Sequence, residues 1–209
     1  MAPELRGLYV ILDPQVAAGR NLVHITREAI AGGARLIQWR DKTREKGLQL
    51  PQLEAIVAVC RVSSVPLIIN DDADVALAIG ADGVHVGQKD LPVEALRRIG
   101  PASWIVGAST NNVSEAKKAV ADGASYVSVG NLFGTSSKLD TRPATLDVLT
   151  HVKEAVSVPV CAIGGISEMN IASVIAARAD IASVISAVVA SDNPRGAAER
   201  LASAFEKMR

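Results

Sequence analysis

Short apolar runs rich in β-branched residues recur along the chain, and none of them alternates cleanly between apolar and polar positions. Near-continuous hydrophobicity is typical of parallel strands buried on both faces, whereas strict alternation marks a strand with one wet face. The pattern therefore predicts eight buried strands: Leu8–Leu12, Leu36–Arg40, Leu67–Asn70, Gly83–Val86, Trp104–Ala108, Tyr126–Gly130, Val160–Ile163 and Ile181–Ile185.

Ala-rich segments with helical spacing lie between these runs, for example Val113–Asp122, Ile171–Ala177 and Pro194–Met208. Alternating strands and helices predict parallel pairing with right-handed crossovers. Dividing 209 residues by eight gives about 26 for each strand, helix and two short loops. No linker or low-complexity tract marks a second domain. We therefore predict an α/β protein, a single-domain (β/α)8 TIM barrel over residues 1–209; an open doubly wound sheet is the alternative.

Composition excludes several classes of protein. The 22 Lys and Arg residues balance 22 Asp and Glu residues, and aromatic residues make up 3% of the chain. These values argue against a surface for nucleic acid. No stretch is long and apolar enough to span a membrane, and no secretory signal is visible. Cys60 and Cys161 are far apart, which fits two buried thiols in a reducing compartment. We expect a cytoplasmic protein that acts on small molecules, for which a homo-oligomer is compatible with the sequence.

The end of the second predicted strand carries one amide and two cations on the same face. Gln38, Arg40 and Lys42 follow a period of two, which directs them together toward the mouth of a barrel. In such barrels the loops after the strands build the active site. Guanidinium and ammonium groups beside an amide suit a phosphate or diphosphate ligand. The alternative is a solvated strand end.

Carboxylates follow the third and fourth strands. Asp71 comes directly after Asn70, and Asp90 follows the next strand. Since neighbouring barrel strands lie within reach of one another, these two aspartates could share Mg²⁺, whose other positions would be filled by water and phosphate oxygens. Alternatively Asp71 or Asp72 caps one helix and Asp90 another. We interpret Asp72 as a cap, and Asp71 with Asp90 as a metal site.

Phosphate ligands are also expected after the later strands. Two glycines after the seventh strand allow backbone N–H groups to approach a phosphate, and a helix N-terminus after the eighth completes the usual phosphate site of these barrels. His85 is interpreted as a satisfied inner residue, and His24 and His151 as residues on helix surfaces. The candidate residues in these later loops are Ser109, Thr135, Ser137, Lys138, Gly164, Gly165, Ile185 and Ser186.

In order and spacing, these elements resemble the thiamine-phosphate synthase family, from about Gly7 to about Leu201. The resemblance is carried by Gln38-x-Arg40-x-Lys42, Asn70-Asp71, the run from Ala81 to Asp90, Gly107-x-Ser109, Thr135-x-Ser137-Lys138, the run from Ala162 to Ile166, and Ile185-Ser186. It implies an enzyme that joins hydroxymethylpyrimidine diphosphate to thiazole phosphate, or to its carboxylated precursor, with release of pyrophosphate.

The resemblance also implies a role for each matching residue. Asp71 and Asp90 would hold Mg²⁺, and Ser109 would line the pyrimidine pocket. The diphosphate would be bound by Gln38, Arg40, Lys42, Asn70 and Lys138, with Arg40, Lys42 and Lys138 as electrostatic catalysts. The thiazole phosphate would be held by Thr135, Ser137, Gly165, Ile185 and Ser186.

The chain departs from the family pattern at three points. Ser137 replaces the usual Thr, Asn111 stands where His is often found, and the segment after Lys138 lacks the usual glycine. The alternatives are a thiazole tautomerase, which would use a histidine, a Schiff-base aldolase with Lys42 or Lys138 as nucleophile, and a non-catalytic barrel that binds phosphate ligands.

Overall fold

The computed structural model of the chain describes residues 5–134 and 142–206. Its strands close into one ring in sequence order, every neighbouring pair parallel. The strands are β1 (Gly7–Leu12), β2 (Ala34–Trp39), β3 (Leu67–Asn70), β4 (Gly83–Val86), β5 (Ile105–Thr110), β6 (Tyr126–Val129), β7 (Val160–Ile163) and β8 (Ile181–Val184). The pairing of β1 with β8 closes the barrel and excludes the open sheet.

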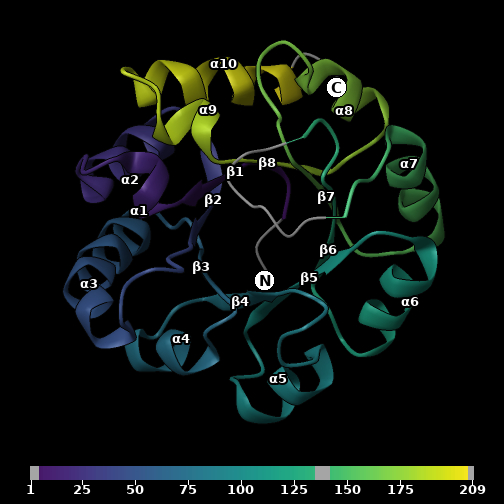
Figure 1. The fold of residues 1–209 in the computed structure, drawn as a ribbon, viewed down its shortest axis with the longest axis horizontal. Helices are drawn as coiled ribbons and strands as arrows, with labels where there is room; N and C mark the ends of the chain where they lie inside the picture. The colour runs from purple at the N-terminus through teal and green to yellow at the C-terminus, as the bar shows by residue number, and fades with distance from the viewer. Residues whose placement is uncertain (1–4, 135–141, 207–209) are drawn as a thin grey trace.

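Helices surround the ring of strands (Figure 1). They are α1 (Pro14–Ala17), α2 (Leu22–Ala31), α3 (Lys46–Val62), α4 (Ala73–Ile79), α5 (Val93–Ile99), α6 (Val113–Ala121), α7 (Leu146–Ala155), α8 (Ile171–Ala176), α9 (Ser186–Val189) and α10 (Pro194–Glu206). Side-chain caps begin several of them; the Asn21 side chain, for example, accepts a bond of 3.0 Å from the His24 N–H at the start of α2. No helix in the described ranges is long and apolar enough to span a membrane.

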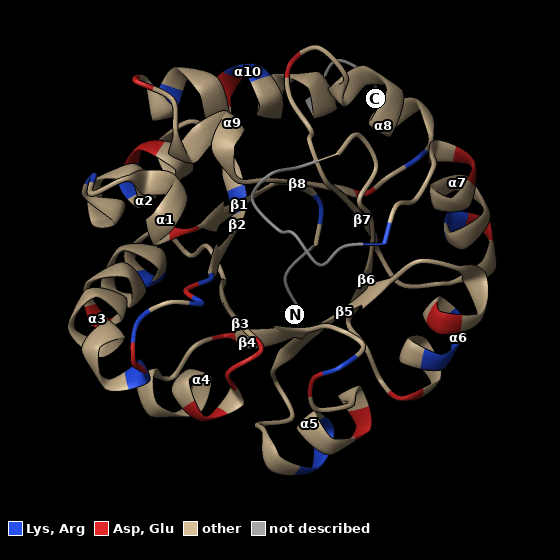
Figure 2. Cartoon of the chain, in the orientation of Figure 1, with Lys and Arg blue, Asp and Glu red and all other residues tan. Residues whose placement is uncertain are grey.

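The barrel has two hydrophobic layers. A large shell of aliphatic residues lies between the strands and the helices. A smaller inner layer fills the closed end of the barrel: Leu5, Tyr9, Leu36, Ile68, Ile105, Tyr126, Cys161 and Ile181. Lys and Arg are mixed with Asp and Glu over the outer helices and loops (Figure 2), and the formal net charge is zero.

The strand prediction is confirmed, with one shift that matters for the site. We expected the fifth strand to end at Ala108, but β5 continues to Thr110 because Ser109 and Thr110 pair in register with Ser128 and Val129. Ser109 therefore belongs to the wall of the barrel and not to a loop. Both thiols are buried and free, as predicted.

Candidate active site

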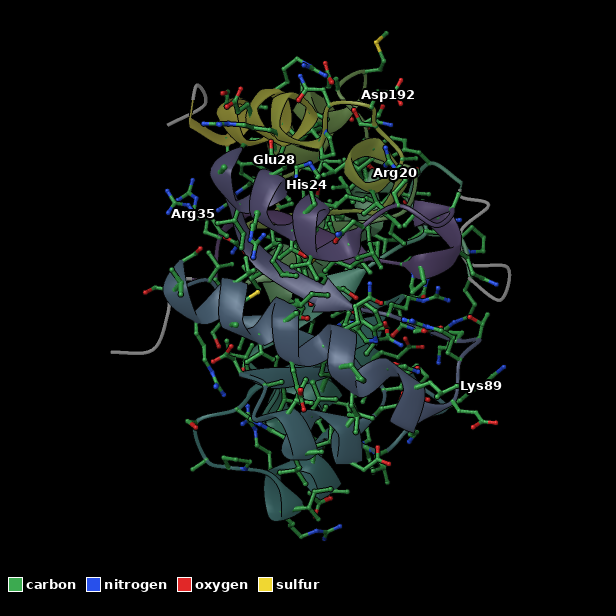
Figure 3. All side chains as sticks on the ribbon, turned by 90° about the vertical axis from the view of Figure 1, so that its left-hand side faces the viewer. Arg20, His24, Glu28, Arg35, Lys89 and Asp192 are labelled. Carbon is green, nitrogen blue, oxygen red and sulfur yellow. The ribbon has the colours of Figure 1, made fainter. Side chains whose placement is uncertain are left out.

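The C-terminal ends of all eight parallel strands meet at one end of the barrel. In the side view of Figure 3, Arg35 near the start of β2 and Lys89 after β4 lie at opposite ends of the molecule. The residues that follow each strand therefore gather at the end marked by Lys89, which we call the mouth. Strand ends position functional groups firmly because the strands themselves are buried in a rigid wall.

Both cations at the exit of β2 are ion-paired. The Arg40 Nη1 donates to Asp13 Oδ2 at 2.5 Å, and the pair is almost buried, with side-chain exposures of 12% and 4%. Asp13 also accepts a hydrogen bond of 3.0 Å from the Gln15 N–H, so one carboxylate caps α1 and fixes the guanidinium. The half-exposed Lys42 ammonium pairs with Asp71, which follows the neighbouring strand β3. The exit of β2 thus presents two oriented positive charges.

Asp71 and Asp90 face each other beside Lys42. Burial raises the pKa of Asp71, and so do the hydrogen bond and the negative charge of Asp90, while Lys42 opposes the shift. The backbone of Asp71 has φ of 60°, a left-handed conformation that Asp adopts more readily than most residues. Asp90 is held by the Gly87 N–H at 2.8 Å. Two facing carboxylates fit a hard divalent cation that keeps water and phosphate oxygens as its other ligands, and such an ion would compete with Lys42 for Asp71.

No larger cluster of metal-ligating side chains occurs in the described part of the chain. The alternative reading of the aspartates as helix caps finds little support. Asp72 occupies the N-cap position of α4, but its side chain makes no capping bond and instead pairs with Lys46 at 2.7 Å. Helix α5 begins at Val93 after Pro92, so Asp90 is not its cap. The cap interpretation of Asp72 is therefore correct in position and wrong in chemistry.

A chain of hydrogen bonds crosses the inside of the barrel beneath the mouth. Gln38 Nε2 donates to Tyr9 Oη at 2.6 Å, and Tyr9 Oη lies 3.1 Å from Tyr126 Oη. Tyr126 Oη is 2.8 Å from His85 Nδ1, and His85 Nε2 is 3.0 Å from Ser109 Oγ. The prediction that His85 is a satisfied inner residue is confirmed, because both ring nitrogens are bonded.

The remaining candidate beside Lys42 and Asp71 is Asn70. It is the last residue of β3, is half-buried, and pairs in register with His85 of β4. Its neighbour Asp71 follows directly, so amide and carboxylate leave the same strand end. The structure thus brings Asn70, Asp71 and Asp90 to one side of the mouth, next to Lys42.

The two glycines after β7 have a packing role that the sequence did not reveal. Gly164 and Gly165 have φ of 106° and 64°. A Cβ on Gly164 would lie 2.2 Å from Asn131 Oδ1, and one on Gly165 would lie 2.2 Å from the Gly134 carbonyl oxygen. The loop after β6 therefore rests directly on this turn, and no side chain fits between them.

The loop after β8 is open to a ligand. Ile185 is half-buried and Ser186 is exposed at the start of the short helix α9. In this four-residue helix the Val188 and Val189 N–H groups already donate to the Ile185 carbonyl oxygen, at 3.2 and 2.8 Å. The predicted ligands Thr135, Ser137 and Lys138 lie outside the described residues.

Similarity to known proteins identifies the family of the chain. The family model described as Thiamine monophosphate synthase matches residues 8–188. The chain belongs to the thiamine monophosphate synthase family. It is 48% identical over 202 residues to the thiamine-phosphate synthase of Roseiflexus castenholzii, covering 95% of this chain and 88% of the relative. It is 45% identical to that of Methanoregula boonei, covering 97% and 96%.

A solved structure agrees with these relatives. The thiamine phosphate pyrophosphorylase from Pyrococcus furiosus superimposes with a TM-score of 0.90 at 35% identity, covering 99% of this chain and 98% of that one. A 3-hexulose-6-phosphate synthase matches with a TM-score of 0.69 at 20% identity, which shows only the shared barrel. Membership of the synthase family makes the protein a transferase.

Asn111 stands where the synthase family often has His. In this chain its side chain bonds to backbone carbonyl groups of two segments. Its Nδ2 donates to the Gly130 oxygen at 2.7 Å and to the Arg142 oxygen at 3.0 Å. Arg142 in turn makes two bonds of 2.8 Å to the Glu115 carboxylate. The hydrogen bonds from Arg142 lower the pKa of Glu115. Together these groups anchor the chain where the described structure resumes after β6.

Sequence reasoning missed Asp13, Tyr9 and Tyr126. Period two from Leu8–Leu12 would have directed Tyr9 inward, and Asp13 stands just after a strand, where functional polar residues were expected. The two tyrosines are the only ones in the chain. Because both tyrosines lie in predicted strands, their hydroxyl groups could have been expected to form hydrogen bonds inside the barrel.

Proposed function

We propose that this chain joins 4-amino-2-methyl-5-hydroxymethylpyrimidine diphosphate to thiazole phosphate, or to its carboxylated precursor. The bond between the pyrimidine CH₂ and the diphosphate oxygen breaks, pyrophosphate leaves with the electron pair, and the thiazole nitrogen forms the new C–N bond. The products are thiamine phosphate and pyrophosphate, and with the carboxylated precursor the carboxylate also leaves as CO₂. The observation that carries the proposal is the pairing of Lys42 with Asp71, which faces Asp90, beside the strand end where Asp13 fixes Arg40.

The charges of the mouth suit a departing diphosphate. When the CH₂–O bond breaks, negative charge develops on the leaving group, and fixed positive charges stabilise it without reorganisation. Asp13 holds Arg40 in place before substrate arrives, with a donor distance of 2.5 Å. Lys42 pairs with Asp71 and can turn to the diphosphate once that carboxylate has another cation. Lys138 is proposed as a further donor to the leaving group.

Asp71 and Asp90 would hold Mg²⁺. When bound, this ion would neutralise charge on the diphosphate oxygens. The raised pKa of Asp71 shows that a proton is retained more readily there than on a free aspartate, so a cation at this point would displace it. Gln38, Asn70 and Ser109 would orient the pyrimidine and its diphosphate from the walls of the mouth.

The second phosphate would bind on the opposite side of the mouth. Gly165, Ile185 and Ser186 lie at the ends of β7 and β8, and Thr135 and Ser137 belong to the same proposed subsite. Holding the thiazole nitrogen beside the forming cation is then a matter of positioning, which can supply a large part of the rate.

Specific features argue against a tautomerase and against an aldolase that uses Lys42. A tautomerase would need a histidine where Asn111 is occupied with backbone carbonyls. A Schiff-base aldolase needs a buried, uncharged lysine, whereas the Lys42 side chain is 49% exposed and ion-paired. A non-catalytic barrel would bind both ligands and release nothing.

The decisive experiment mixes the purified chain with both substrates and Mg²⁺ and measures pyrophosphate and thiamine phosphate. Release of both in equal amounts supports the proposal; binding of both substrates without pyrophosphate identifies a non-catalytic barrel. The same assay with thiazole phosphate and its carboxylated precursor decides which acceptor is preferred.

We also propose that the chain forms one domain over residues 1–209 and works in the cytoplasm, in keeping with its two free, buried thiols. Size-exclusion chromatography with light scattering tests whether the chain forms a homo-oligomer.

A further inference from the structure

The hydrogen-bonded chain inside the barrel links two proposed pyrimidine ligands on different strands. Gln38 on β2 and Ser109 on β5 are its ends, and Tyr9, Tyr126 and His85 are the links. The links are closely packed: the rings of Tyr9 and Tyr126 meet edge to face, with centroids 6.1 Å apart. The His85 ring stacks on Tyr126 at 5.5 Å.

The packing leaves little freedom for these rings to turn. A Cβ on Gly107, in β5, would lie 2.2 Å from Tyr126 Cζ and 2.5 Å from His85 Nδ1. Only glycine at this position allows the two rings to approach the strand. Tyr9 and Tyr126 are almost completely buried, and burial raises the pKa of both phenols, so both keep their protons.

The donor at the Gln38 end favours one direction for the bonds that follow, because each buried hydroxyl then has a neighbour to accept its proton. Gln38 Nε2 can only donate, so Tyr9 Oη accepts and its single proton is available for Tyr126 Oη. Tyr126 then donates to His85 Nδ1. In this direction a neutral imidazole accepts at Nδ1, so its one proton lies on Nε2 and is donated to Ser109 Oγ.

This direction determines what the two ends offer a ligand. With one of its two Nε2 hydrogens given to Tyr9, Gln38 keeps Oε1 as an acceptor. With its oxygen accepting from His85, Ser109 presents its O–H, a donor. An aminopyrimidine offers an amine that donates and a ring nitrogen that accepts, whereas the corresponding oxo-pyrimidine offers a ring N–H and a carbonyl oxygen. The ends match the amino form and oppose the oxo form.

We propose that Tyr9, Tyr126 and His85 are positioning residues that hold Gln38 as an acceptor and Ser109 as a donor, and so select an amino- over an oxo-pyrimidine diphosphate. This inference rests on the proposed function, because it names the group by which that substrate is recognised. A site that is built to hydrogen-bond one pattern rejects the reversed pattern strongly, since buried groups are left unpaired.

The first test reads the histidine tautomer in the protein without ligand. ¹⁵N NMR near neutral pH should show His85 with its proton on Nε2 and a bare Nδ1. The chain has three histidines, and His24→Gln and His151→Gln, both at exposed helix positions, assign the signals (Figure 3 labels His24). In Tyr126→Phe the preference for this tautomer should weaken, whereas Tyr9→Phe should keep it because Tyr126 can still donate.

The second test measures selectivity with the amino- and oxo-pyrimidine diphosphates as paired substrates. The ratio of their kcat/KM values should exceed about 1,000 in the unmodified protein and fall at least about tenfold in both Tyr9→Phe and Tyr126→Phe. Thr110→Val is the matched control. It removes a buried hydrogen bond of 3.1 Å from the same strand as Ser109, outside the inner chain, and should leave the ratio unchanged.

The outcomes separate this inference from the proposed function. If the unmodified protein releases no pyrophosphate from the aminopyrimidine substrate, the proposed function is wrong. If it does, but His85 carries its proton on Nδ1 or is doubly protonated, the inferred direction is overturned. Unchanged selectivity in both tyrosine variants would also overturn it.

Discussion

Replacing Asp71 with Asn separates a structural role of this carboxylate from a metal-binding role. The Asp71–Lys42 pair has side-chain exposures of 17% and 49%, so its loss should cost at most about 1 kcal/mol. In a protein of this size that corresponds to a fall in Tm of roughly 2–4 °C. Removing the negative charge also removes the cost of burying it and its repulsion from Asp90, the effects that raise the pKa of Asp71. In chelator, the variant should therefore melt within about 4 °C of the unmodified protein.

The metal role predicts a much larger effect when Mg²⁺ and pyrophosphate are added. Ligand at 100 times its Kd stabilises a protein by about 2.7 kcal/mol, or roughly 5–10 °C here. Differential scanning fluorimetry with pyrophosphate, with and without Mg²⁺, isolates the Mg²⁺-dependent part. Asp71→Asn should lose that part, and its turnover should fall by more than about 100-fold, because several kcal/mol of charge stabilisation is removed.

The sign of the pH dependence gives an independent check. Because the folded-state pKa of Asp71 is raised, the metal-free protein binds a proton there on folding. That contribution to stability is present at low pH and is lost as pH rises through the raised pKa. Mg²⁺ must displace this proton, so the Mg²⁺-dependent rise in Tm should shrink on acidification sooner than an ordinary aspartate would allow.

Asp72→Asn is the matched control. Asp72 is the next residue, its side chain is 30% exposed, and it pairs with Lys46 at 2.7 Å. It should show the same small loss of stability and retain the full response to Mg²⁺. An undiminished Mg²⁺ response in Asp71→Asn, or an equal loss in Asp72→Asn, would refute the metal assignment.

Three further changes test other parts of the mouth. Lys138→Ala should lower kcat by roughly 100-fold in single-turnover kinetics, the effect of removing one preorganised donor; a change within threefold, about 0.7 kcal/mol or less, would make it a bystander. Asp13→Asn should raise KM for the diphosphate substrate about tenfold, because Arg40 loses its partner at 2.5 Å; an unchanged KM contradicts this. Glu115→Gln should lose about 1 kcal/mol or less at neutral pH, measured by urea unfolding. Since the pKa of Glu115 is lowered by Arg142, this difference should vanish as pH falls through the folded-state pKa, and a difference that persists in acid argues against the ion pair.

Much of the barrel could be predicted because both of its signals are local. Continuous apolar runs indicate strands buried on two faces, and their alternation with helices indicates parallel order. The end of β5 was missed because Ser109 and Thr110 look like loop residues. Their strand geometry comes from pairing with Ser128 and Val129 of β6, a partner that no local pattern identifies.

The site divides in the same way. Positions at strand ends follow from the fold, so the sequence could bring Arg40 and Lys42 toward a common mouth. Their ionic partners could not be predicted, because Asp13 and Asp71 are 27 and 29 residues away along the chain. Which carboxylate reaches which cation depends on the stagger of the strands, and the hydrophobic pattern of the sequence does not indicate this stagger.

The glycines after β7 show how one residue type can carry two explanations. Backbone approach to a phosphate and close contact with a neighbouring loop both require Gly165 to lack a side chain. A Cβ there would lie 2.2 Å from the Gly134 oxygen, so packing alone accounts for the glycine. Ser186 has no such constraint, since it is exposed at the start of α9. Substitution at Ser186, and not at Gly165, therefore reports on phosphate binding without disturbing the loop after β6.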